Sequence, residues 1–85
     1  MTWTVTVARP AQKAVAGFPA KDQVKIEAAV QAMALDPFSG DVIKLEDGGN
    51  RWRRRVGSYR IFFAVDTDAK TVGISAIVRR TSTTY

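Results

Sequence analysis

The sequence contains neither cysteine nor histidine. The absence of cysteine excludes disulfides, thiolate catalysis and zinc–thiolate sites, and it fits a reducing compartment. The absence of histidine removes the usual general base near neutral pH and the commonest metal ligand. Any chemistry in this chain must therefore use other side chains, and we expect neither a metal ion nor a cofactor.

Long hydrophobic runs are also missing. The first residues, MTWTVTV, alternate polar and apolar side chains, whereas a secretory signal needs a continuous apolar run. No apolar stretch approaches the roughly 20 residues of a membrane span. From these absences we expect a soluble, cytoplasmic protein without a membrane partner.

The chain has 85 residues, of which 46% are hydrophobic. This length predicts one domain over residues 1–85 with a single small core. The apolar fraction is typical of a globular fold and too high for a disordered tail. A domain of this size is marginally stable alone, so a protein partner would stabilise it appreciably.

The positive charge is concentrated in the C-terminal part of the chain. Residues 1–50 carry five basic and six acidic side chains, a balance of −1, whereas residues 51–85 carry eight basic and two acidic ones, a balance of +6. A basic surface can serve solubility alone. An asymmetry of this size, however, indicates a polyanionic partner.

Apolar periodicity predicts an α+β fold in the order β-α-α-β-β-β. Pro10 suits the first turn of a helix, and Asp36-Pro37 ends a second one. We expect an N-terminal strand, a helical hairpin and a three- to four-stranded, mainly antiparallel twisted sheet, with the hairpin on one face. The expected elements are a strand at 3–7, helices at 10–15 and 21–35, an extended piece at 42–45, and strands at 51–56, 59–65 and 71–78.

The strand at 51–56 carries charge on alternate residues. Its Arg51, Arg53 and Arg55 share one face, while Trp52 and Val56 point to the core. Three like charges in a row repel one another, and folding does not require them. We therefore expect a counter-charge from another molecule on the sheet face that the helices leave free.

Two segments resemble a known family. The run RWRRRVGSYRIFF at residues 51–63 is similar to the signature of the RelE/ParE toxin superfamily, in which a basic strand leads through a glycine turn into Tyr-Arg and an apolar strand. Residues 74–85, ISAIVRRTSTTY, resemble the closing strand of that family, with its basic end and late tyrosine. The resemblance implies a RelE-like fold and the toxin of a bacterial or archaeal type II toxin–antitoxin system.

The superfamily contains two activities. RelE-type members cleave mRNA in the ribosomal A site, whereas ParE-type members inhibit DNA gyrase and lack the catalytic set. RelE-type ribonucleases have two basic residues on the first strand of the meander, an arginine after the tyrosine of the turn, an arginine closing the last strand, and a tyrosine six residues later. In this sequence these positions fall on Arg51, Arg53, Arg60, Arg79 and Tyr85, which favours the ribonuclease.

The resemblance implies cleavage by the 2′-hydroxyl of the RNA itself, which leaves a 2′,3′-cyclic phosphate. Guanidinium groups suit this reaction because they bind phosphate oxygens through paired donors. Arg60 and Arg79 would stabilise the transition-state charge, and Tyr85 would stack on a base or orient the 2′-hydroxyl. The implied catalytic residues are Arg53, Arg60, Arg79 and Tyr85, and the implied RNA-binding residues are Arg51, Arg53, Arg55 and Arg80.

The sequence departs from the family at its first two basic positions. The best-known members have lysines where Arg51 and Arg53 stand here. Arginine stays protonated and is a poor general base. With no histidine present, proton removal falls to Tyr85, to water or to the ribosome.

Several prominent side chains have a structural interpretation. Tyr59 is expected in the core beside Ile61 and Phe63, and Trp3 and Trp52 are likewise expected in the core rather than as base-stacking platforms. Arg9, Arg54 and Arg80 are expected to be surface charges rather than catalytic groups. Arg54 has core-facing parity, so its guanidinium would extend over the edge of the sheet.

The resemblance also implies partners. These are a cognate antitoxin with an acidic, partly disordered segment that covers the basic face, and mRNA in the ribosomal A site. The antitoxin would dock on the helix at 26–35 or on the exposed sheet edge, and the complex would bind its operator DNA through the antitoxin. Two alternatives stay open: a ParE-like gyrase inhibitor without catalysis, and an inactive relative that binds RNA in a salt-sensitive manner.

Overall fold

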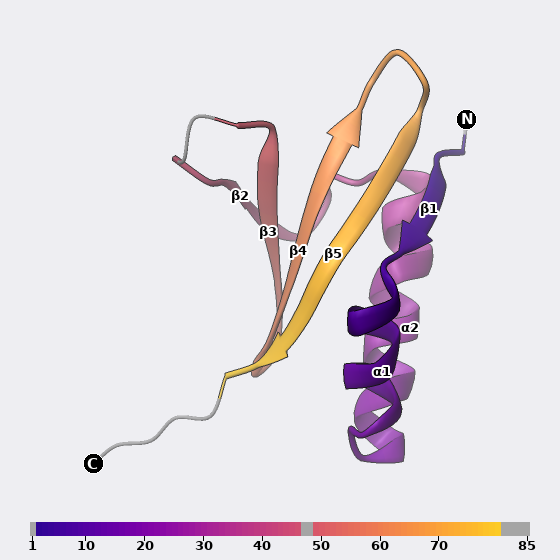
Figure 1. Ribbon diagram of the computed structural model, residues 1–85, viewed down its shortest axis with the longest axis vertical. Coiled ribbons are helices and arrows are strands. Elements are labelled where there is room, and N and C mark those ends of the chain that lie inside the picture. Colours follow the sequence, from indigo (N-terminus) through magenta and orange to yellow (C-terminus); the bar gives the residue numbers. More distant parts are fainter. Residues whose placement is uncertain (1, 47–48, 81–85) are drawn as a thin grey trace.

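A computed structural model describes residues 2–46 and 49–80 of the chain. Its five strands form one sheet in the order β1-β5-β4-β3-β2, and two helices pack on one face of it (Figure 1). The elements are β1 (Thr4–Val7), α1 (Arg9–Ala16), α2 (Ala20–Leu35), β2 (Asp41–Lys44), β3 (Arg51–Val56), β4 (Tyr59–Asp66) and β5 (Thr71–Arg79).

The two helices begin and end where backbone chemistry requires it. Pro10 lies in the first turn of α1, where its missing N–H leaves no helical hydrogen bond unmade. Gly17 closes that helix by donating its N–H to the carbonyl of Ala14. Asp36, which precedes Pro37, takes an extended conformation and ends α2. The chain therefore turns back sharply after each helix and forms the expected hairpin.

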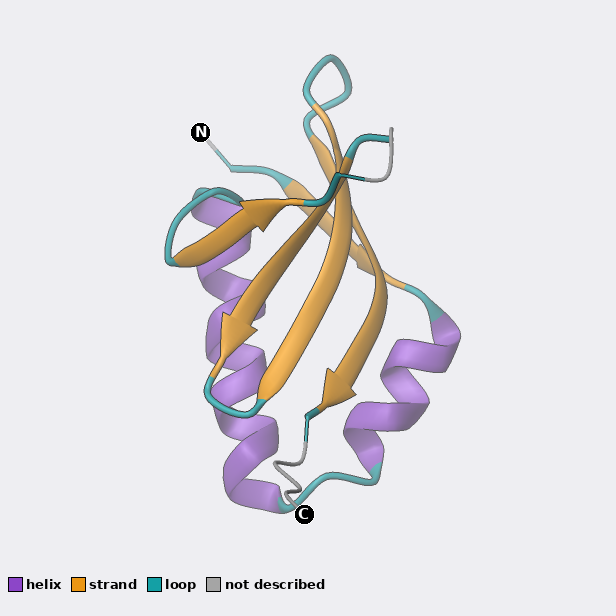
Figure 2. Cartoon of the chain, turned by 90° about the vertical axis from the view of Figure 1, so that its left-hand side faces the viewer, coloured by secondary structure: helices purple, strands orange, loops and turns teal. Residues whose placement is uncertain are grey.

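The core lies between the helices and one face of the sheet. Helix α2 buries residues at helical spacing, Ile26, Ala29 and Met33. Strand β4 buries every second residue from Tyr59 to Val65, which is the alternation expected of a strand with one covered face. Figure 2 shows the opposite face of the sheet without a covering helix. Polar side chains on that face are therefore available to a partner.

Strands β3, β4 and β5 form the antiparallel meander that the sequence predicts. Gly57 has a φ of 57° in the turn between β3 and β4, a conformation that glycine adopts at little cost. The β4–β5 ladder contains one irregularity, because Phe62 pairs with Ala76 whereas Phe63 pairs with Ile74. Ser75 is the extra residue of this bulge, and it shifts the alternation of β5 by one position.

The sheet has five strands rather than three or four. Strand β1 joins it by parallel pairing with β5, and β2 pairs with β3 as the opposite edge strand. The piece expected at 42–45 thus belongs to the sheet and begins one residue earlier, at Asp41. Such a short edge strand carries little sequence signal of its own, because the pairing with β3 stabilises it.

The α+β fold predicted from the sequence is confirmed, and no element end moves by more than one residue. Trp3 and Trp52 are partly buried and pack against the core, with Phe38 between them, as ring-centroid distances of 6.4 Å and 4.8 Å indicate. No helix within the described residues is long and apolar enough to span a bilayer.

Candidate functional site

The arginines of β3 and β4 meet on the uncovered face of the sheet. In the β3–β4 ladder, Arg55 pairs with Arg60 and Arg53 pairs with Phe62. Directly paired residues project to the same side of an antiparallel sheet. Tyr59 and Ile61, the neighbours of Arg60, are buried under the helices, so Arg53, Arg55 and Arg60 project away from the helices. This confirms the shared face predicted for the alternate arginines of residues 51–56.

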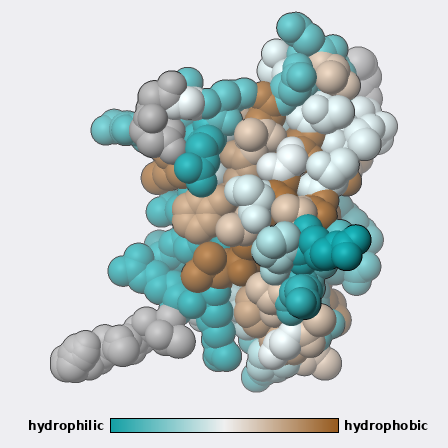
Figure 3. All heavy atoms as spheres, in the orientation of Figure 1, coloured by the Kyte–Doolittle hydropathy of each residue, from teal (hydrophilic) through white to brown (hydrophobic). Residues whose placement is uncertain are grey.

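An open hollow of about 530 Å³ lies at the end of the sheet where β3, β4 and β5 converge. Figure 3 shows hydrophilic surface at this end of the sheet, next to some hydrophobic side chains. The N–H of Arg80 donates to the carbonyl of Ser58, which fixes the backbone just beyond β5. We call this site the arginine hollow; its lining residues are Arg53, Arg60, Phe62, Val78, Arg79 and Arg80.

Arg60 lies at the centre of this positive charge. Partial burial lowers its pKa, and the neighbouring positive charges of Arg55, Arg80 and Arg53 lower it further. The nearby carboxylate of Asp41 acts in the opposite direction. A guanidinium stays protonated even so. Arg60 therefore carries a charge that its surroundings disfavour, and a bound phosphate would relieve this.

Arg79 lines the same hollow, but its side chain leaves the sheet on the other side. It pairs with Tyr59, whose side chain lies on the helix side. Simple alternation from the buried Ile74 would place Arg79 on the open face, and the bulge at Ser75 reverses this. The guanidinium carbon of Arg79 lies 5.9 Å from the centroid of the Tyr59 ring. Arg60 and Arg79 thus flank the end of the sheet from opposite sides.

The remaining site residues predicted from the sequence lie apart from the hollow or outside the described residues. Arg51 pairs with Ala64 at the far end of β3, four residues from Arg55, which corresponds to roughly 13 Å along a strand. Arg55 is exposed at the margin of the hollow. Tyr85 lies outside the described residues, so its role stays a prediction.

One acidic side chain in this region was missed by the sequence reasoning. Asp41, on β2, has a carboxylate oxygen 3.9 Å from a guanidinium nitrogen of Arg53, and its side chain is 56% exposed. It pairs with Arg55 and so shares the face of the arginines. The register of β2 on β3 cannot be predicted from local sequence, and it is this register that brings Asp41 to the site. A carboxylate beside the arginines can accept a proton in place of the histidine that the sequence lacks.

Arg54 is not the surface charge expected from the sequence. Its side chain points to the helix side and donates to the carbonyl oxygen of Ser39 at 2.8 Å. Gly40, with a φ of 83°, lies against this guanidinium, since an added Cβ would be 3.0 Å from the Arg54 Cζ. Arg54 therefore holds the loop that leads into Asp41. The predicted reach over the sheet edge is correct, but the function of the side chain is structural.

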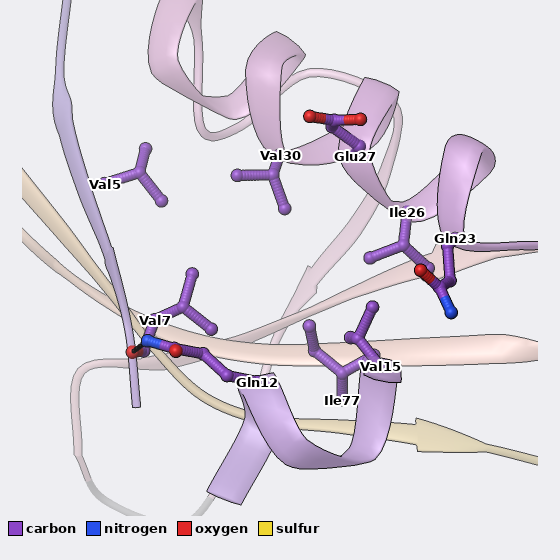
Figure 4. A pocket seen from close by; sticks show the side chains of 9 residues that line it. All are labelled: Val5, Val7, Gln12, Val15, Gln23, Ile26, Glu27, Val30 and Ile77. Atoms are coloured by element: carbon purple, nitrogen blue, oxygen red, sulfur yellow. Dashed lines mark hydrogen bonds between the residues drawn. The ribbon is translucent and has the colours of Figure 1, made fainter. Parts of the chain in front are cut away.

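A second, more apolar groove of about 590 Å³ lies between β1 and the two helices. Figure 4 shows its valine and isoleucine side chains converging from both layers, with Gln12, Gln23 and Glu27 at the margin. Glu27 is its one ionisable lining residue, so the groove is poorly suited to catalysis. Within the described part of the chain, no three histidine, cysteine or acidic side chains come together as a metal site would require.

The family follows from a comparison with known sequences. The model described as the ParE toxin of type II toxin–antitoxin systems, parDE, matches residues 5–83. The chain belongs to the ParE toxin family. This confirms the predicted membership of the RelE/ParE superfamily and makes the protein a toxin of a type II toxin–antitoxin system. No curated protein matches the sequence.

Solved structures of RelE proteins share the fold. A chain of the archaeal RelE–RelB complex from Pyrococcus horikoshii is 26% identical, with a TM-score of 0.83 over 98% of this chain and 100% of that one. A chain of the RelBE2 toxin–antitoxin complex from Mycobacterium tuberculosis is 18% identical, with a TM-score of 0.84 over 94% and 100%. The isolated E. coli RelE toxin is 11% identical, with a TM-score of 0.79 over 95% and 87%. The family model is that of ParE toxins, whereas the similar structures are RelE toxins. Membership of the superfamily therefore does not determine which of its two activities the chain has.

Proposed function

We propose that this toxin is a ribosome-dependent endoribonuclease that cleaves mRNA and thereby inhibits translation. The observation that carries the proposal is the arginine hollow, where Arg53, Arg60, Arg79 and Arg80 meet at one end of the sheet. Guanidinium groups converging on an open hollow suit a phosphodiester better than a protein surface, because they neutralise charge and bind oxygens through paired donors. The resemblance of residues 51–63 and 74–85 to RelE-type members supports the same activity.

In the proposed reaction the 2′-hydroxyl of the RNA attacks the adjacent phosphorus. The O2′–P bond forms, the P–O5′ bond breaks, and the products are a 2′,3′-cyclic phosphate and a 5′-hydroxyl. Arg60 and Arg79 bind the non-bridging oxygens and stabilise the extra negative charge of the transition state. Arg53, Arg55 and Arg80 hold the neighbouring backbone, and Tyr85 orients the 2′-hydroxyl or stacks on a base.

Asp41 completes the proton balance. We assign it the role of accepting the 2′-hydroxyl proton, because its carboxylate lies beside Arg53 on the face of the arginines. The departing O5′ takes its proton from water. A phosphate bound in the hollow would compete for Arg53, and the carboxylate released from this contact could then accept the proton.

The test is primer extension on a reporter mRNA after induction of the toxin in growing cells. The wild-type chain should give discrete cuts within translated codons, and the Arg60→Ala/Arg79→Ala double variant should give none. Arg9→Ala is the matched control, because Arg9 is an exposed arginine of α1 remote from the hollow. Growth arrest with uncut mRNA would reject the ribonuclease.

A second candidate function is inhibition of DNA gyrase without catalysis. The match of residues 5–83 to the ParE toxin model favours it. In this case the arginine hollow would bind an acidic surface or DNA, and growth arrest would be accompanied by DNA damage and intact mRNA. Arrest would also survive Arg79→Ala, whereas the ribonuclease would be disabled by that change. An inactive relative would bind RNA and cause neither outcome.

We further propose a cognate antitoxin whose acidic segment binds the sheet face opposite the two helices. The like-charged pair of Arg55 and Arg60 supports this, because a carboxylate between them would stabilise the folded toxin. Similar RelE structures were determined in complex with RelB antitoxins. The complex would bind its operator DNA through the antitoxin. Purification of a fully active toxin from cells without any such partner would contradict the proposal.

A further inference from the structure

The side chains of Arg79 and Arg60 leave the sheet on opposite faces, so they do not meet directly. Arg79 pairs with Tyr59 and Arg60 pairs with Val78, so the two arginines project to opposite faces. For both to contact one phosphate, the guanidinium of Arg79 must stay close to the end of the sheet. An exposed arginine otherwise samples many rotamers, and that freedom would be lost on each binding event.

The ring of Tyr59 is the surface against which Arg79 lies. Tyr59 is 3% exposed, and its ring packs on Phe18 with a centroid distance of 4.6 Å. The guanidinium carbon of Arg79 is 5.9 Å from the Tyr59 ring centroid, within the range in which a cation is attracted to an aromatic ring. The ring is therefore fixed from below by the helical layer and contacted from outside by Arg79.

A buried carboxylate locks the orientation of this ring. The hydroxyl of Tyr59 donates to Oδ2 of Asp22 at 2.6 Å, a length typical of a strong hydrogen bond to an ionised acceptor. Asp22 lies in the first turn of α2 and is only 8% exposed. The bond joins residues 37 positions apart in the sequence. Because a buried carboxylate is costly without a donor, each member of the pair fixes the other.

We propose that Asp22 and Tyr59 are positioning residues, which hold the guanidinium of Arg79 at the end of β5 where it meets the phosphate bound by Arg60. The proposal rests on the ribonuclease function of the arginine hollow. The phenol bonded to a carboxylate carries extra electron density, which strengthens the attraction of its ring for a cation. The helical layer thus contributes to a site on the far face of the sheet by restricting one side chain in advance.

The test compares cleavage of a short mRNA on programmed ribosomes by purified variants, at a temperature where circular dichroism shows each of them folded. Tyr59→Leu, which removes the ring face, should lower kcat by about 10-fold or more with little change in KM, because a displaced transition-state contact costs rate. Tyr59→Phe, which keeps the ring but loses the hydrogen bond to Asp22, should restore only part of that loss. Glu27→Ala, an exposed acidic residue of the same helix, is the matched control.

A double-variant cycle separates positioning from a general loss of structure. If Tyr59 acts through Arg79, then Tyr59→Leu/Arg79→Ala should cleave no more slowly than Arg79→Ala alone. A merely structural Tyr59 would instead lower kcat by the same factor in both backgrounds, and that result would overturn the proposal. If Tyr59→Leu does not fold, Asp22→Ala takes its place in the cycle. This variant retains the Tyr59 ring but removes the hydrogen bond that fixes its orientation.

A second measurement does not depend on cleavage. In the folded toxin the δ-methylene protons of Arg79 should show an upfield ring-current shift by NMR, which Tyr59→Phe reduces and Tyr59→Leu abolishes. If the wild-type toxin does not cleave RNA, the ribonuclease proposal fails while this shift still decides whether Tyr59 positions Arg79. An Arg79 spectrum that is unchanged by Tyr59→Leu would overturn the positioning role whatever the activity.

Discussion

Arg55 and Arg60 lie directly opposite each other in the β3–β4 ladder, on the sheet face that points away from α1 and α2. Like charges in such a pair destabilise the folded protein. The toxin thus keeps an unfavourable contact at the place where a polyanion would bind. This is the relation expected when binding and stability make opposite demands on one site.

Replacement of one member of this pair should stabilise the protein. Arg55→Gln removes the repulsion and should raise Tm by about 1–3 °C at low ionic strength. The gain should shrink in salt, because salt screens the repulsion in the wild-type chain. Thermal unfolding followed by circular dichroism at two salt concentrations measures both effects, with Arg9→Gln as the control. An unchanged or lower Tm for Arg55→Gln at low salt would show that Arg55 has a structural partner.

Asp41→Asn should change binding and catalysis in opposite directions. Loss of the negative charge beside Arg53 and Arg60 should tighten RNA binding severalfold at low salt. Loss of the proton acceptor should slow cleavage by about 100-fold, the lower end of what proton transfer contributes. Binding of single-stranded RNA by fluorescence anisotropy and single-turnover cleavage measure the two separately. A variant that binds more tightly and cleaves at least as fast would exclude Asp41 as the base.

The hydroxyl of Tyr59 should make stability depend on alkaline pH. Burial raises the pKa of Tyr59 above its ordinary value of 10, and the hydrogen bond to Asp22 raises it further. The folded state then holds the phenol proton more tightly than the unfolded state does. The resulting stabilisation is fully present below about pH 10 and is lost as the pH rises through the raised pKa.

Urea unfolding at pH 8 and pH 11 measures this dependence, and Tyr59→Phe should flatten it. The sequence has two tyrosines, Tyr59 and Tyr85. In Tyr85→Phe, tyrosinate absorbance should therefore appear only together with alkaline unfolding. Tyrosinate formation near pH 10 in a fully folded Tyr85→Phe variant would show that the Tyr59 hydroxyl is exposed to solvent.

Gly40→Ala tests the loop that delivers Asp41. Gly40 has a positive φ, and in this conformation a residue with a side chain lowers the stability of the fold by about 1–2 kcal/mol. The added Cβ would also press on the Arg54 guanidinium. Both stability and the cleavage rate should fall. Gly17→Ala is the matched control, since Gly17 has a φ of −91° and an added Cβ would meet only the Ala14 carbonyl at 3.6 Å. Equal effects of the two changes on unfolding would contradict this role of the loop.

The features that the sequence predicts well are those with a local cause. Alternation with period two identifies β3 and β4 and places Arg53 and Arg55 on a common face, because strand geometry alone determines which side chains share a face. Helix α2 follows from the spacing of Ile26, Ala29 and Met33 and from the stop before Pro37. The family resemblance rests on β3 and β4 together with residues 74–85, and the helices do not contribute to it.

The features that could not be predicted from the sequence depend on contacts between segments that lie far apart along the chain. Asp41 reaches the arginines only through the register of β2 on β3. Arg79 faces Tyr59 because the bulge at Ser75 reverses the alternation of β5. From the sequence, Asp22 is an ordinary polar residue in the first turn of a helix, and nothing near it indicates its hydrogen bond to Tyr59. Each of these relations is a property of the assembled sheet and its covering helices.

The most direct test of the ribonuclease uses purified toxin, programmed ribosomes and a short mRNA whose product ends are identified by mass spectrometry. The proposal predicts a cut in the A-site codon that leaves a 2′,3′-cyclic phosphate, with the rate reduced by about 100-fold or more in Arg60→Ala. DNA supercoiling by gyrase, assayed with the same preparation, should be unaffected. An intact mRNA together with inhibited gyrase would contradict the proposal and assign the arginine hollow to the other activity of the superfamily.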